Sequence, residues 1–434
     1  MEANKTPLHT VALTMLGTSL TQFLLSYCFN MTSALTPELT SLWDFNLLFI
    51  GLMYMLVALP GIGWMVVANK MIPRVGITRV YMGVIIVVIV GLIISFGAAL
   101  TTTNDWRKFF FLGGQVITSA AVAAAVCIDA IQITAFRNPT RALPFSLIGS
   151  AQIIADQLGW FAAYLTIPLL MDISMSVAMA SVIPVAVMLI VSVIGTQYFY
   201  EGVQKGEKPE NCFITGAVIA STHVGTIYAL VATGVAMGAL DVFRRFMSPI
   251  WMAAFALPPD LVDQQIAWFI LPGIVFSLLV GLMGWSKIAL YISLALACGS
   301  FAATAVFIFI GNGTTFGSIA TGGFAKEAAM FFVGGNALFG VLVSAAIPLV
   351  ILPKDTVRVC AAIEIARMLS QSVCSLLFGL LMDIGLRHLN IVLLMGIIIG
   401  GSAAAAFYTL MYIPKNDKKD DSLLPQMIQI STTS

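Results

Sequence analysis

Residues 110–115 read FFLGGQ, and residues 331–336 read FFVGGN. The same pairing recurs at two other places: ALTPEL at 34–39 returns as ALPPDL at 256–261, and LLMDI at 169–173 returns unchanged at 380–384. In each pair the second copy follows the first by 211 to 222 residues, and the three pairs keep one order along the chain. This collinear repeat predicts a chain built as two similar halves.

The composition excludes an ordinary soluble protein. Of the 434 residues, 59% are hydrophobic and 9% are charged, whereas soluble domains carry roughly 25% charged residues. A helix needs about 20 apolar residues to cross a bilayer. The sequence offers twelve such runs, at 9–30, 45–68, 80–100, 109–132, 144–168, 176–199, 225–255, 264–284, 288–310, 327–351, 357–382 and 390–413. These runs are too long for barrel strands, so the predicted fold is all-α, a polytopic membrane protein with twelve transmembrane helices.

The repeat divides the twelve helices into two groups of six. We expect an N-terminal six-helix bundle at 1–200, a cytoplasmic linker and lead-in at 201–224, a C-terminal six-helix bundle at 225–414 and a cytoplasmic tail at 415–434. The seventh helix has two possible registers, 225–255 and 213–239, because the apolar stretch there is too long for one helix. The repeat favours the first register.

Lysine and arginine predict the orientation in the membrane. With a cytoplasmic N-terminus, fourteen of the 21 Lys and Arg residues fall in inner segments, four fall in outer loops and three fall within helices. Cytoplasmic loops carry the excess of positive charge, so both termini are expected in the cytoplasm. The first helix is not followed by a cleavage site and is expected to be retained. The short connections are typical of a multi-pass protein of a bacterial inner membrane.

No cofactor, metal or nucleic acid is expected. The six cysteines never form a Cys-x-x-Cys motif, and the three histidines lie far apart in the sequence. This pattern predicts neither a disulfide framework nor a metal site. The chain also has no phosphate-binding loop of the Walker type, which argues against ATP as the energy source.

A basic segment between the second and third helices, ANKMIPRVGITR at 68–79, carries a family resemblance. With its six-plus-six helices and inner termini, the chain resembles the major facilitator superfamily, whose loop signature there is Gly-x-x-x-Asp-Arg-x-Gly-Arg-Arg. Arg74 and Gly76 match this signature, and Arg79 stands one position late. The resemblance implies a gating loop made by these three residues. Pro73 replaces the family's Asp, so the acid of the usual inner-gate contact is missing.

Charged residues within the predicted helices are the candidates for function, because a charge near the bilayer centre costs a few kcal/mol or more. Asp156 and Gln157 lie on the fifth helix, and Glu364 and Arg367 lie on the eleventh. The seventh helix carries Asp241, Arg244 and Arg245; the repeat makes Gln22 on the first helix the counterpart of Arg244. In the family resembled here, helices one, five, seven and eleven line the central cavity.

These positions predict two kinds of site residue. Arginine binds two carboxylate or phosphate oxygens at once; the predicted substrate-binding residues are Arg244, Arg367, Gln22, Gln157 and Asp241. A partly desolvated carboxyl can take up a proton, which makes Asp156 and Glu364 the proton-coupling candidates. The structural alternative is pairing within one helix: Asp241 with Arg244 or Arg245, and Glu364 with Arg367.

A chain of two transmembrane bundles around a central site is typical of a secondary transporter. We expect alternating-access transport of a small organic solute, with an organic anion and proton coupling favoured, Na⁺ as the other possible coupling ion, and a monomer as the working unit. A multidrug/proton antiporter is the alternative within transport. A membrane-embedded lipid-modifying enzyme is the alternative of another class; the scattered histidines supply no obvious base for it.

Overall fold

The computed structural model describes residues 8–101, 103–136, 145–201, 224–255, 257, 259–283, 287–311, 324–343 and 356–416. The first half of the chain forms α1 (Leu8–Ala34), α2 (Thr36–Leu42), α3 (Leu47–Val75), α4 (Ile77–Gly97), the short 3-10 helix η1 (Ala98–Leu100), α5 (Asn104–Thr118), α6 (Ala121–Phe136), α7 (Phe145–Met171), α8 (Met175–Ala180) and α9 (Val182–Glu201). The second half forms α11 (Val224–Arg245), α12 (Met247–Phe255), α13 (Pro259–Met283), α14 (Lys287–Gly311), α15 (Ala325–Val341), α17 (Thr356–Asp383) and α18 (Arg387–Asn416).

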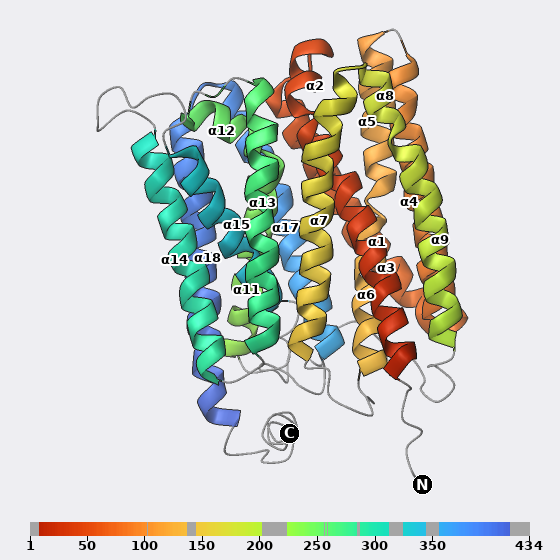
Figure 1. The fold of residues 1–434 in the computed structure, drawn as a ribbon, viewed down its shortest axis with the longest axis vertical. Coiled ribbons are helices and arrows are strands. Elements are labelled where there is room, and N and C mark those ends of the chain that lie inside the picture. The colour runs from red at the N-terminus through yellow and green to blue at the C-terminus, as the bar shows by residue number, and fades with distance from the viewer. Residues whose placement is uncertain are drawn as a thin grey trace.

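The protein is a multi-pass membrane protein. Within the described ranges, ten segments are helical, long and apolar enough to cross a bilayer; together with α13 and α15 they account for the twelve predicted crossings. The helices run side by side, and α1 begins at the end of the bundle where α18 ends (Figure 1). Helices dominate because lipid offers the backbone no hydrogen-bond partner.

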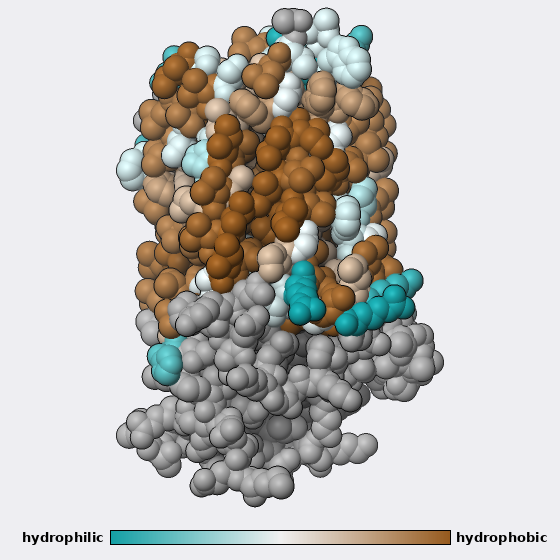
Figure 2. Space-filling model, turned by 90° about the vertical axis from the view of Figure 1, so that its right-hand side faces the viewer, coloured by the Kyte–Doolittle hydropathy of each residue, from teal (hydrophilic) through white to brown (hydrophobic). Residues whose placement is uncertain are grey.

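An apolar belt surrounds the bundle. The face seen in Figure 2 is hydrophobic over most of its height and becomes polar towards the top and along its lower edge. Large apolar side chains on α4 and α9, such as Ile93 and Val191, are exposed. A soluble monomer rarely exposes a continuous apolar surface of this extent, so the belt is the surface that contacts lipid.

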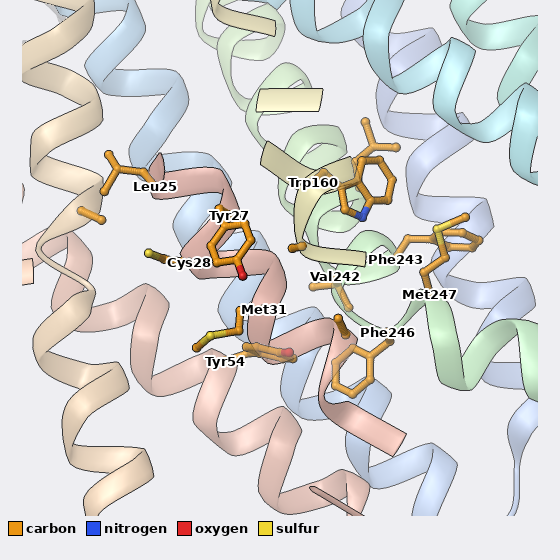
Figure 3. Close-up of a cluster of buried hydrophobic side chains, with 14 of the residues drawn as sticks. Leu25, Tyr27, Cys28, Met31, Tyr54, Trp160, Val242, Phe243, Phe246 and Met247 are labelled. Atoms are coloured by element: carbon orange, nitrogen blue, oxygen red, sulfur yellow. The ribbon is translucent and has the colours of Figure 1, made fainter. Parts of the chain in front are cut away.

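The two halves pack against each other through two long helix pairs, α3 with α17 and α7 with α13. A third contact zone between the halves is a cluster of buried apolar side chains. In Figure 3 this cluster draws Tyr27 and Met31 from α1, Tyr54 from α3, Trp160 from α7 and Phe243 from α11 towards one another. The polar site described below borders this cluster, because Tyr54 and Trp160 also contact its arginines.

The seventh crossing is α11 followed by α12. Because α11 continues to Arg245, the register that ended this helix at residue 239 is wrong. The favoured register, 225–255, covers both helices but misses their interruption at Phe246. Pro249 explains the interruption, since it has no N–H to donate to the carbonyl of Arg245 one turn earlier. The predicted linker and tail lie outside the described residues, apart from their first and last positions in α9, α11 and α18.

The basic segment after the second helix is not a loop. The α3 helix extends to Val75, and α4 begins at Ile77, so the predicted connection of about ten residues is a turn at Gly76. Gly76 adopts a φ of 88°, which favours glycine, and its N–H donates to Ile72 O (3.0 Å). Arg74 lies in the last turn of α3, where a cation interacts favourably with the helix dipole.

Candidate functional site

A polar cavity of about 90 Å³ lies between the halves. Its polar lining comes from α1, α7, α11 and α17: Gln22, Ser26, Asn30, Asp156, Asp241, Arg244, Arg245, Glu364, Arg367 and Gln371. The volume corresponds to about three water molecules in the liquid. In this conformation the cavity therefore admits only a short solute.

Arg244 joins the two halves. Its Nη1 donates to Asp156 Oδ2 (2.5 Å) and its Nη2 to Asp156 Oδ1 (3.3 Å), a bidentate contact from α11 to α7. Its Nε donates to Asn30 Oδ1 (3.1 Å) and its Nη2 to Ser26 Oγ (3.0 Å), both on α1. The guanidinium carbon lies 4.3 Å from the ring centroid of Trp160. Each side of this guanidinium is thus occupied by the N-terminal half.

Arg367 binds two carboxylates within the C-terminal half. Its Nε donates to Asp241 Oδ2 (2.5 Å) on α11, and its Nη1 donates to Glu364 Oε1 (2.6 Å) on its own helix. The second oxygen of Glu364 is buried and has no hydrogen-bond partner in the protein. The i,i+3 pair of Glu364 and Arg367 is confirmed. The predicted pairing of Asp241 within α11 is wrong, because Asp241 and Arg244 point to different helices.

Arg245 is held by aromatic rings instead of an acid. Its guanidinium carbon lies 4.8 Å from the ring centroid of Tyr54 on α3 and 5.3 Å from that of Phe29 on α1. Such cation–π contacts hold a guanidinium without neutralising it. Among the described residues, Arg245 is the cavity arginine that forms no ion pair with a carboxylate.

The ionised side chains that line the cavity are balanced in number, with three arginines against three carboxylates. Their arrangement is uneven: Arg244 takes one carboxylate, Arg367 takes two and Arg245 takes none. A cavity arranged in this way has one guanidinium available to an anion and one carboxylate in excess around Arg367.

The structure brings together most, but not all, of the predicted site residues. Gln22 lines the cavity beside Asp156, Asp241, Glu364 and the arginines. Gln157 is fully buried but does not line the cavity; a Cβ added to Gly273 on α13 would lie 3.2 Å from its Oε1, which places its amide at the α7–α13 contact. Its role in binding substrate stays a prediction.

The three residues of the predicted gating loop lie elsewhere. Arg74 and Arg79 are exposed on either side of the turn at Gly76. They belong to the connection between α3 and α4 and do not line the cavity. Their gating role also stays a prediction.

Four cavity residues were not predicted from the sequence: Ser26, Asn30, Arg245 and Gln371. Only Arg245 left a signal, because the seventh helix carries one Asp against two Arg. Ser26, Asn30 and Gln371 are ordinary polar residues in apolar helices, and their packing neighbours identify them only in three dimensions. Among the described residues, no cluster of three His, Cys, Asp or Glu side chains could hold a metal ion.

Comparison with solved structures identifies the architecture. A structure described as the major facilitator superfamily proton:xylose symporter XylE, bound to 6-bromo-6-deoxy-D-glucose, matches with a TM-score of 0.69 and 14% identity over 94% of this chain and 96% of that one. The chain has the major facilitator fold. A partially occluded inward-open conformation of the xylose transporter XylE from E. coli matches with a TM-score of 0.63 and 14% identity, covering 94% of this chain and 98% of that one.

A second transporter of this fold also matches. The nucleoside transporter NupG gives a TM-score of 0.63 and 12% identity over 92% of this chain and 98% of that one. No protein-family model and no curated protein sequence matches the chain. The low identities mean that the shared property is the major facilitator fold, and the cavity of this chain must be interpreted from its own residues.

Proposed function

We propose that this protein is a secondary active transporter of the major facilitator type, which moves a small organic anion across the membrane by alternating access and couples this movement to protons. The observation that carries the anion assignment is Arg245, a guanidinium in the cavity with two aromatic neighbours and no carboxylate partner among the described residues. A substrate carboxylate can supply that partner through two hydrogen bonds.

The uneven charge arrangement supports proton coupling. When Glu364 takes up a proton, the Asp241–Arg367 pair remains, and the cavity gains one net positive charge. A bound monoanion at Arg245 then restores neutrality, so that proton and anion cross together without leaving a net charge in the membrane. Asp156, the other candidate, is held by both nitrogens of Arg244; we therefore favour Glu364 as the proton carrier.

The cavity fits the alternatives less well. A multidrug antiporter needs a site for lipophilic cations, whereas three arginines contribute to this lining. A lipid-modifying enzyme needs a nucleophile and a base at a membrane face, and the solved structures of this fold that match are those of transporters. The solutes named for those transporters are a pentose and nucleosides, so neutral solutes belong in any test of the substrate.

The proposal includes the membrane context. We place both termini in the cytoplasm, where the excess of Lys and Arg belongs, and the protein in a bacterial inner membrane. We propose a monomer as the working unit, because one chain supplies α1, α7, α11 and α17 to the cavity.

Binding and flux measurements test the proposal. Purified protein is screened by thermal shift against short carboxylates, phosphorylated metabolites, xylose, uridine and tetraphenylphosphonium, and each hit is followed as uptake into proteoliposomes under an H⁺ or a Na⁺ gradient. We expect a carboxylate to raise the unfolding temperature and an inward H⁺ gradient to drive its uptake.

Arg245→Gln should abolish both effects, while Arg387→Gln, which removes an exposed arginine at the start of α18, should leave them intact. Stabilisation by xylose, uridine or the lipophilic cation alone would show that the anion assignment is wrong. Uptake driven by Na⁺ alone would refute proton coupling.

A further inference from the structure

Gln371 is a buried polar side chain that the protein leaves without a partner. It lies on α17 one turn after Arg367 and lines the cavity, and its exposed fraction is 0%. Neither its amide nitrogen nor its amide oxygen forms a hydrogen bond with any described part of the protein. An i,i+4 spacing places Gln371 on the same face of α17 as Arg367, so the helix presents a guanidinium and an amide to one space.

Such an amide needs a reason. Leaving a buried donor and acceptor unpaired opposes folding by a factor of about 5 to 150 in the equilibrium constant. Gln115 on α5 shows the ordinary arrangement: it is also buried, and its Nε2 donates to Ser95 Oγ (3.4 Å). An apolar side chain of similar size at position 371 would avoid the cost, which indicates that the amide at this position serves a ligand.

The chemistry of the ligand follows from the amide. A glutamine side chain both donates and accepts, and a hydroxyl group is the small group that can satisfy either role. Arg245, in the same cavity, is available for a carboxylate. The cavity of about 90 Å³ limits the distance between these two groups on one ligand to a few bonds.

We propose that Gln371 is a specificity-determining residue that hydrogen-bonds a hydroxyl group of the substrate, and that the substrate is a short hydroxycarboxylate. This inference rests on the proposed function, because it takes the carboxylate at Arg245 as given. It adds a second point of recognition on the opposite half of the cavity lining, from α17. A carboxylate without the hydroxyl leaves the amide unpaired and is discriminated against for that reason.

A pair of ligands that differ only in the hydroxyl tests the inference. Lactate and propionate are titrated against purified wild-type protein, Gln371→Met and Gln115→Met, and the unfolding temperature of each ligand-free protein is recorded. We expect the wild type to bind lactate at least about tenfold more tightly than propionate, a discrimination within the range of one lost hydrogen bond. In Gln371→Met the two affinities should agree within about threefold, through weaker binding of lactate.

The unfolding temperatures separate a ligand-binding role from a structural one. Gln371→Met replaces an unpaired amide by an apolar side chain of similar size and should raise the unfolding temperature of the ligand-free protein. Gln115→Met breaks a hydrogen bond and should lower it, while the preference for lactate persists. A lower unfolding temperature in Gln371→Met would show that the amide stabilises the fold and would overturn the inference.

The ligand results distinguish the two proposals. Equal binding of lactate and propionate to the wild type would overturn the role of Gln371 and leave the anion transporter standing. Failure of both carboxylates to bind, together with stabilisation by xylose or uridine, would overturn the proposed substrate class and the hydroxycarboxylate inference with it.

Discussion

Asp383 connects the last turn of α17 to the first turn of α3, across the boundary between the halves. Its Oδ1 accepts from Leu47 N and its Oδ2 from Leu48 N, each at 3.1 Å. The two helices come this close because Gly379, one turn earlier on α17, has no side chain; a Cβ there would lie 3.1 Å from the Cα of Leu48. The contact lies at the end of the bundle away from the start of α1 (Figure 1).

The perturbation is Asp383→Asn, which keeps the shape and removes the charge. A carboxylate at an exposed helix N-terminus contributes about 0.3–1 kcal/mol. Since about 1.4 kcal/mol corresponds to a factor of ten, the variant should shift the equilibrium towards the state open at this end by about two- to fivefold. The effect should shrink at high salt, because the carboxylate is exposed.

Spin labels at Leu42 and Leu386 report the opening, since both side chains are exposed and lie in opposite halves near this end. The six native cysteines are replaced first. Asp383→Asn should raise the population of the longer distance. Asp172→Asn is the matched control, because Asp172 occupies the repeat-equivalent position and is exposed. Identical distance distributions in wild type and Asp383→Asn, or equal shifts in both variants, would refute the reasoning.

Three further predictions concern the cavity. Arg244→Gln leaves the mostly buried carboxylate of Asp156 without its cation and should destabilise the protein by about 3–5 kcal/mol; chemical unfolding measures this, and Asp156→Asn in the same chain should restore part of the loss. Glu364→Gln should abolish uptake driven by an H⁺ gradient but retain exchange of substrate for substrate, as followed with radiolabel in proteoliposomes. Arg245→Lys should bind the transported anion about tenfold more weakly, because an ammonium lacks the planar fork, and titration calorimetry on the purified variant would show no such loss if Arg245 were only a packing residue.

The sequence predicted the twelve crossings because each depends on local properties, the length and apolarity of a run. It failed where distant residues decide the outcome. The partner of Arg244 is Asp156, 88 positions away on α7, and spacing along one helix could propose only Asp241. Likewise, no local pattern separates Gln371, which lines the cavity, from Gln157, which packs towards α13. The turn at Gly76 was within reach of local reasoning, since a basic residue followed by glycine is typical of a helix end.

The order in which the charges are synthesised affects how the chain enters the membrane. When Arg244 on α11 leaves the ribosome, Asp156 on α7 has already been made and can accept it. Asp241, on the same turn of α11, must wait for Arg367, which follows 126 residues later. Until α17 arrives, α11 carries an acid whose partner does not yet exist, and insertion of such a helix is costly. A chain truncated before α17 should therefore retain α7 stably in the bilayer but release α11 to quality-control proteolysis.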